Sequence, residues 1–273
     1  MSEITDVRDG FARASISALS HVPFVTRLKR HPFAVTAYFR HSLVITYAFP
    51  ATVLEPLLPP GLVLDIWNGF GFLAIAMVQT ERLRPAFFPA VFGQNFFLSG
   101  YRIFARFTDS AGRSLRGLRI LRSDTDRPLM KRFGNLLTHY NYRLADARFT
   151  ANSNSIEARI ATPNAEADLH VHAALDCIPT APPPGSPFSN LREARLFSGP
   201  LPFTFDYEPE SHSIIVIEGV RRNWKPIPVN VEILENTFLK KDPFNRDVPR
   251  LANAFLVRDV PYSWMRGRVH PLR

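Results

Sequence analysis

Four consecutive residues, His139 to Tyr142, combine side chains that exchange protons with side chains that donate hydrogen bonds. An imidazole titrates near neutral pH, and phenol and amide groups orient polar ligands. We therefore take His139, Tyr140 and Asn141 as candidate catalytic residues, and Asn141 and Tyr142 as candidate substrate-binding residues. Far upstream, Arg40 carries a planar guanidinium, a group that binds a carboxylate through two parallel hydrogen bonds. We expect Arg40 to bind the substrate in the same pocket as Asn141.

A purely structural role is the alternative for both parts of this site. Arg40 would then neutralise Asp65 or Glu55, and His139 would cap the end of a strand. The sequence leaves these two interpretations open, because each requires the same residue types at the same positions.

A second group of polar residues, Asp168, His170 and His172, alternates along a predicted strand, so the three side chains leave the same face. Two histidines at this spacing, with a third oxygen or nitrogen ligand, suit zinc. A strand with one face in water predicts the same pattern. We therefore expect no metal and no cofactor, and these three residues are the weak candidates if a metal binds.

The element that positions Arg40 is a predicted strand from Phe39 to Phe49. Apolar residues alternate along it with a second set that includes Arg40 and Thr46, which indicates a strand with one polar face. Residues 50–58 follow as a short predicted helix, since Pro50 favours a helix start and the next prolines and glycine end it.

The next two segments, 62–67 and 70–78, are predicted to pair as an antiparallel hairpin. Asn68 and Gly69 separate them, and this dipeptide supplies the positive φ values of a two-residue turn. Strands are also predicted over 213–220 and 229–234.

A predicted helix from Asp126 to Leu137 precedes the candidate catalytic residues, with Pro128 near its start and a row of apolar residues along one face. The segment after it is predicted to be a strand. Alternation then places His139, Asn141 and Arg143 on one face, and we expect that face to line the pocket.

The order of these elements resembles the opening of the acetoacetate decarboxylase-like superfamily. Arg40, Ile45, Tyr47 and the Leu58-Pro59-Pro60-Gly61 stop match its first strand, helix and turn, and the resemblance continues to about residue 175. It is closest to a branch known as a domain of unknown function. The resemblance implies a mainly β (α+β) fold: an antiparallel closed or conical β-barrel or double sheet, with a few peripheral helices and an interior pocket.

The resemblance also exposes two departures from the decarboxylases. Asn141 stands where their Schiff-base lysine would be, and Leu98 where their glutamate would be, so that Arg40 alone is retained. Loss of a nucleophile lowers a rate by on the order of 10³ to 10⁶, so Schiff-base decarboxylation is not expected. A relocated catalytic lysine, Lys131 or Lys225, is a minor alternative.

Three functions remain open. The first is a barrel protein that binds a small organic acid or ketone without a Schiff-base lysine. The second is a lysine-free lyase or hydratase acting on a small carboxylic acid, which leaves enzymatic activity uncertain. The third is a basic protein that binds nucleic acid or an anionic surface, less expected because the positive charges are dispersed. The stretch that best fits this third function contains six arginines: Arg102, Arg106, Arg113, Arg116, Arg119 and Arg122.

Composition sets the domain organisation. The chain has 273 residues, 46% of them hydrophobic, which suffices for one large core. We expect a helical N-terminal segment over 1–30 and one domain over 31–273, with a Pro-rich loop at 178–188.

No apolar run approaches the roughly 18 residues that span a membrane, and the N-terminus lacks the features of a signal peptide. A cytoplasmic location is therefore expected, and assembly into a homo-oligomer is compatible with the sequence.

Overall fold

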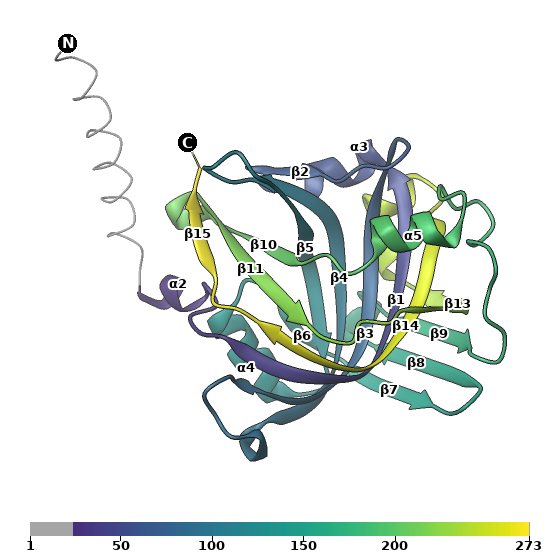
Figure 1. Cartoon of the computed structure of the whole chain (residues 1–273), viewed down its shortest axis with the longest axis horizontal. Helices are drawn as coiled ribbons and strands as arrows, with labels where there is room; N and C mark the ends of the chain where they lie inside the picture. Colours follow the sequence, from purple (N-terminus) through teal and green to yellow (C-terminus); the bar gives the residue numbers. More distant parts are fainter. Residues whose placement is uncertain (1–23, 273) are drawn as a thin grey trace, which may run out of the picture.

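The computed structural model describes residues 24–272, and the N-terminal segment expected over 1–30 therefore lies largely outside the described residues. The described chain is mainly β-structure, with an 11-stranded sheet, a 4-stranded sheet and a few short helices (Figure 1). The prediction of a mainly β fold with peripheral helices is confirmed. Within residues 24–272, no helix is long and apolar enough to cross a membrane.

The large sheet contains β1 (Val35–Pro50), β2 (Leu62–Leu64), β3 (Phe70–Pro85), β4 (Gln94–Thr108), β5 (Ser114–Thr125), β6 (Tyr142–Leu144), β10 (Phe203–Glu208), β11 (Ser213–Arg221), β12 (Ile227–Pro228), β14 (Arg250–Trp264) and β15 (Arg268–Pro271). The small sheet contains β7 (Asp146–Ala151), β8 (Ser155–Ala161), β9 (Leu169–Ala174) and β13 (Asn230–Asn236). The α-helices are α2 (Phe24–Leu28), α3 (Ala51–Leu54), α4 (Pro128–Leu137) and α5 (Leu191–Ser198). Six 3₁₀ turns complete the described elements: Glu55–Leu57, Ala90–Phe92, Pro163–Ala165, Pro209–Ser211, Phe238–Lys240 and Phe244–Arg246. The Pro-rich residues 178–188 form neither helix nor strand.

The large sheet curls round until its two flanks meet. Its order is β12-β14-β1-β3-β4-β5-β10-β11-β15, and β11 also pairs with β14. That extra contact consists of three residue pairs, Gly219–Trp264, Val220–Ser263 and Arg221–Tyr262, which we call the seam. The large sheet is mixed, because β5 pairs in parallel with both β10 and β6, and it is therefore not a clean antiparallel barrel.

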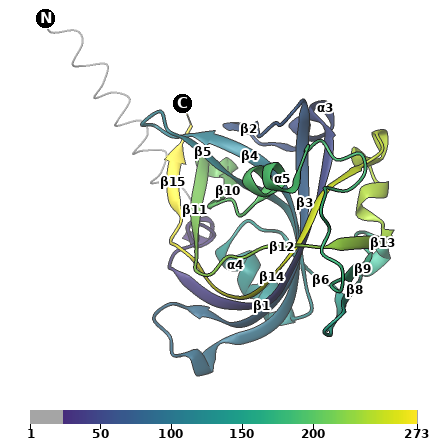
Figure 2. The same cartoon turned by 45° about the vertical axis from the view of Figure 1, so that its right-hand side comes forward.

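The two faces of the large sheet are both covered. The small sheet lies beside the large sheet (Figure 2). One face of β1 carries Leu43 and Ile45, which pack with Ile156 and Val171 of the small sheet in one core. The other face looks into the interior of the curled sheet. Ser42 and Thr46 on the expected polar face of β1 are therefore buried as well, whereas Arg40 is exposed.

The predicted turn at Asn68-Gly69 is confirmed, with φ values of 50° and 82°. The predicted pairing across it is wrong apart from one bridge between Trp67 and Phe70. Strand β2 pairs with β4, while β3 pairs with β1 and β4. The local dipeptide fixes the turn, but it does not determine which strands pair with the segments on either side of it.

Candidate functional site

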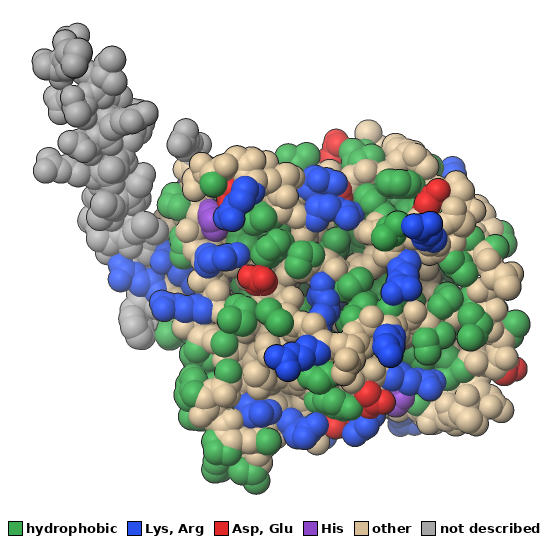
Figure 3. Space-filling view, in the orientation of Figure 1, with side chains coloured by type: hydrophobic (Ala, Val, Ile, Leu, Met, Phe, Trp, Pro, Cys, Tyr) green, Lys and Arg blue, Asp and Glu red, His purple; other side chains and the backbone are tan. Residues whose placement is uncertain are grey.

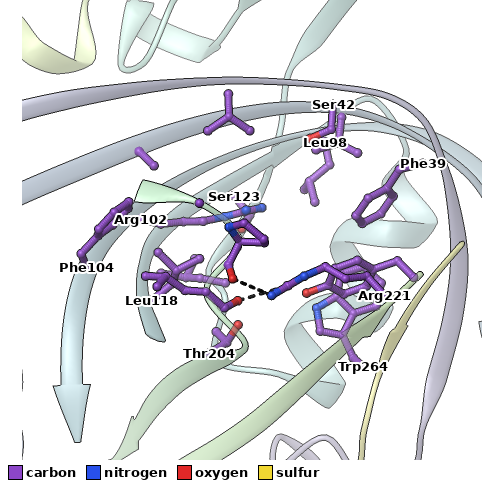
Figure 4. Close-up of a pocket in the computed structure, with 18 of the residues that line it drawn as sticks. Phe39, Ser42, Leu98, Arg102, Phe104, Leu118, Ser123, Thr204, Arg221 and Trp264 are labelled. Carbon is purple, nitrogen blue, oxygen red and sulfur yellow. Dashed lines mark hydrogen bonds between the residues drawn. The ribbon is translucent and has the colours of Figure 1, made fainter. Parts of the chain in front are cut away.

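The interior of the curled sheet holds a cavity of about 100 Å³. Strands β1, β3, β4, β5, β6, β10, β11 and β14 all contribute to its wall. Most of the wall is apolar. Two arginines and three tyrosines bring guanidinium and phenol groups into the wall: Arg102, Arg221, Tyr140, Tyr142 and Tyr262. Figure 4 shows the two arginine side chains extending toward the middle of the cavity from opposite sides.

Arg102 on β4 is the most unusual of these side chains. It makes no hydrogen bond or ion pair with any described residue, and its Nε is buried without a partner. The titratable groups near it are the phenols of Tyr262, Tyr142 and Tyr140, and burial lowers the pKa of its guanidinium below the ordinary value. Arginine nevertheless stays protonated in proteins, so the cavity wall carries a half-buried positive charge. Such a charge is costly unless an anion accompanies it.

The position of Arg102 depends on Gly100, two residues earlier on the same face of β4. A Cβ at position 100 would lie 2.9 Å from the Nε of Arg102 and 3.0 Å from its Nη2. The guanidinium therefore lies back along its own strand, over the glycine. The absence of a side chain at position 100 makes this conformation available.

Arg221, at the end of β11, is held by main-chain oxygens. Its Nη2 donates to the carbonyl of Pro200 at 2.6 Å, and its Nη1 donates to the carbonyl of Leu201 at 3.2 Å. The guanidinium also lies 5.3 Å from the centre of the Trp224 ring, within cation–π range. The indole Nε1 of Trp224 is buried without a hydrogen-bond partner. These contacts orient Arg221 without neutralising it.

The tyrosines supply further donors. Tyr140 and Tyr142 are buried, and burial raises the pKa of both phenols well above the ordinary value, so they remain protonated. Thr204 lies beside the Tyr140 hydroxyl, yet that hydroxyl has no partner with normal hydrogen-bond geometry. The residues that line the cavity in the described chain include no Asp, Glu, His or Lys. Positive charge and hydrogen-bond donors thus face a space with no protein counter-ion.

Arg40 lies outside this cavity, on the surface. Its Nη1 is 2.8 Å from Asp259, its Nε is 3.1 Å from Glu81, and its side chain is 47% exposed. The structural alternative named different partners, and Asp65 is instead bound by Arg106 and Arg116. The structure does not bring Arg40 together with Asn141.

Asn141 is also directed away from the cavity. It is exposed with a φ of 53°, and its side chain has a single long contact, 3.5 Å, to the carbonyl of Leu121. The predicted alternation fails because β6 begins only at Tyr142, so residues 139–141 are not a strand. Tyr140 and Tyr142 face the cavity instead, and His139 does not line it.

Asp168, His170 and His172 do not converge on one point. Both the main-chain N–H and the hydroxyl of Thr162 donate to Asp168, and His170 pairs with Glu157 at 2.9 Å. Among the described residues, no group of three or more His, Cys, Asp or Glu is placed to hold a metal.

Most arginines of the stretch proposed to bind nucleic acid form ion pairs within the protein instead. Five of the six guanidinium groups have carboxylate partners: Arg106 and Arg116 with Asp65, Arg113 with Asp109, Arg119 with Asp206, and Arg122 with Asp124. The sixth is Arg102. Sequence reasoning grouped it with a surface stripe and missed its role, although a charged residue between Gly100 and Phe104 on an apolar strand face is a usable signal.

Comparisons with known proteins agree with this architecture. A model of the DUF2071 family, described as an uncharacterized conserved protein, matches residues 36–261. No curated protein matches the chain. The fold is shared with the enduracididine biosynthesis enzyme MppR complexed with pyruvate, at 11% identity and a TM-score of 0.55, covering 87% of this chain and 90% of that chain.

Two further solved structures share the fold. An acetoacetate decarboxylase-like enzyme from Sphingomonas wittichii is 12% identical with a TM-score of 0.54, covering 90% of this chain and 95% of that chain. An acetoacetate decarboxylase from Legionella pneumophila is 10% identical with a TM-score of 0.53, covering 87% of each chain. The predicted resemblance to the acetoacetate decarboxylase-like fold is confirmed.

Proposed function

The chain belongs to the DUF2071 family, and we propose that it binds a small carboxylate anion in the interior cavity, with Arg102 as the principal charged contact. The observation that carries the proposal is the half-buried Arg102 guanidinium, whose Nε is enclosed and which has no anionic partner among the described residues. A bound carboxylate would supply the missing charge and accept hydrogen bonds from the guanidinium.

The surroundings of Arg102 favour a small organic acid over a larger anion. A cavity of about 150 Å³ accommodates benzene, so the interior space of about 100 Å³ admits a molecule of only a few heavy atoms. The apolar part of the wall suits a short carbon chain. Tyr140 and Trp224 each keep an unpartnered polar atom there, and both can donate a hydrogen bond to a carboxylate, keto or hydroxyl oxygen.

A structure that shares this fold contains pyruvate, a small keto acid, and supports this class of ligand.

Catalysis is less well supported than binding. The described cavity wall lacks an imidazole, a carboxylate or an amine that titrates near neutral pH, and the pKa values of its phenols are raised. Binding is therefore the function that the geometry supports best, ahead of a lysine-free lyase or hydratase.

The proposal is tested by calorimetric titration with pyruvate and acetoacetate, and with neutral methyl ketones of similar size. Wild type should bind the acids in preference to the ketones. Arg102→Met should lose about ten- to a hundredfold in affinity for the acids, the usual worth of a charged hydrogen bond. The ligand-free variant should unfold at the same or a higher free energy, because it no longer buries an uncompensated charge.

Arg40→Met is the matched control. It removes an arginine that is paired at the surface and should leave acid binding unchanged, since exposed ion pairs contribute little. Equal loss of affinity in both variants, or equal binding of acids and neutral ketones by wild type, would refute the carboxylate site.

A further inference from the structure

The end of the β3–β4 hairpin projects from the molecule and carries large apolar side chains. Phe87, Phe88, Val91 and Phe92 are 67%, 49%, 82% and 68% exposed, and we call these four residues the apolar tip. In Figure 3 the projection at the lower left, where this hairpin end lies, is mostly green. A contiguous exposed apolar group of this kind is typical of an interaction site.

The apolar tip is held in a defined conformation. The N–H of Ala86 donates to the carbonyl of Ala34 at 2.8 Å, and the side chain of Arg84 donates to the carbonyl of Phe88 at 3.0 Å. At the base, a Cβ on Gly93 would lie 2.5 Å from the main chain of Arg82, so this close crossing requires glycine. The apolar side chains are therefore presented to solvent by an ordered backbone.

Arginines lie next to the apolar tip. A groove of about 580 Å³ begins at the base of the hairpin and is lined by Arg82, Arg84, Arg221 and Arg222, with no Asp or Glu in its described wall. The nearby carboxylates Glu81 and Asp259 are already bound by Arg40. Figure 3 shows blue side chains directly above the green projection.

We propose that the apolar tip and the arginine groove together form a docking surface for an anionic phospholipid bilayer. Aromatic and aliphatic side chains insert at the boundary between headgroups and acyl chains, while guanidinium groups bind lipid phosphates and carboxylates. Nucleic acid would use the arginines but leave the apolar tip in water. A neutral protein partner would use the apolar tip but not the groove. The bilayer satisfies both features, and this surface does not depend on a ligand in the cavity.

The test is sedimentation of the full-length protein with vesicles of phosphatidylcholine alone and vesicles that also contain phosphatidylserine. Wild type should bind the second kind more tightly, and the preference should weaken as salt is raised. Val91→Ser with Phe92→Ser should reduce binding by at least about tenfold, because the side chains that insert are lost. Arg82→Gln with Arg222→Gln should remove the preference for phosphatidylserine.

Leu196→Ser with Val248→Ser is the matched control, since these side chains are 71% and 78% exposed elsewhere on the molecule. This control should bind vesicles as wild type does, and all variants should keep the wild-type unfolding midpoint. The proposal is overturned if wild type does not bind vesicles, or if the apolar tip variant and the control bind equally. It is also overturned if the apolar tip instead mediates a dimer, or if the arginine groove binds a labelled oligonucleotide in preference to vesicles.

Discussion

Gly100 determines where the Arg102 guanidinium lies, because it has no side chain to occupy that space. Because a Cβ at position 100 would meet the far end of the Arg102 side chain rather than the main chain, a substitution there displaces the guanidinium without disrupting β4. The effect of such a substitution should therefore appear in ligand binding more than in folding.

We predict that Gly100→Ala weakens binding of small carboxylates by about tenfold and changes the free energy of unfolding by less than about 1 kcal/mol. The measurement is a double-mutant cycle with Arg102→Met, using calorimetric titration. In the Arg102→Met background, Gly100→Ala should have no further effect on binding. Additive losses would show that Gly100 acts on the site by some route other than Arg102.

The candidate site could be predicted from the sequence only in part. Tyr142 was named as a ligand-binding residue and does line the cavity, whereas Arg40 and Asn141 do not. Periodicity places a side chain on one face of a strand but does not say which face the curled sheet encloses. For Arg40, which stands at a register shift in the pairing of β1 with β3 between Phe39 and His41, and for Asn141, which precedes β6, that information comes from tertiary structure.

At the scale of elements, α4 fixes the start of β6. The Asn135 side chain accepts a hydrogen bond from the main-chain N–H of Tyr142 at 2.7 Å and donates to its carbonyl at 2.9 Å. Gly134 in the preceding position has no side chain to overlap the Tyr142 ring. The helix thus holds both the backbone and the ring of a residue that lines the cavity.

Asn135→Ala should lower the free energy of unfolding by about 1–3 kcal/mol, because both main-chain groups of Tyr142 lose their partner in a partly buried place. Urea denaturation measures this. The exposed Asn245→Ala serves as the control and should change stability by less than about 0.5 kcal/mol. If the two substitutions have equal effects, the Asn135 side chain does not stabilise this junction.

The elements that the sequence predicts well are those set by local chemistry. The strand over Phe39 to Phe49 and the turn at Asn68-Gly69 are observed, and the helix predicted from Asp126 is observed from Pro128. Strand pairing is different, because the parallel contact of β5 with β10 joins residues far apart in the chain. No local pattern encodes that partner, so the parallel pairings of the large sheet cannot be predicted from the sequence.

At the scale of the whole molecule, His31 makes stability depend on pH. Its ring is buried with no partner at Nδ1, and burial lowers its pKa from 6.5 to about 4. The unfolded chain therefore takes up a proton at a higher pH than the folded chain. The contribution of His31 is complete above pH 6.5 and is lost as the pH falls toward 4, by up to roughly 3 kcal/mol.

His31→Asn should flatten the loss of stability between pH 7 and pH 4.5, since asparagine tolerates the φ of 53° at this position and does not titrate. Urea denaturation at several pH values measures the slope. Asp206, whose pKa burial raises to about 6, acts in the opposite direction but is common to both proteins. His212→Asn, at an exposed residue with a φ of 46°, is the control, and an equal change in slope would contradict the assignment.

The seam has a consequence for exchange between the cavity and solvent. Three residue pairs join β11 to β14 there. Four of the six residues involved line the arginine groove outside, and two of those four, Arg221 and Tyr262, also line the cavity. The seam, only three residue pairs long, thus lies between the cavity and the arginine groove. A ligand bound in the cavity by Arg221 of β11 and Tyr262 of β14 would bridge the seam, so its release and the local opening of the sheet there would be coupled steps of one equilibrium.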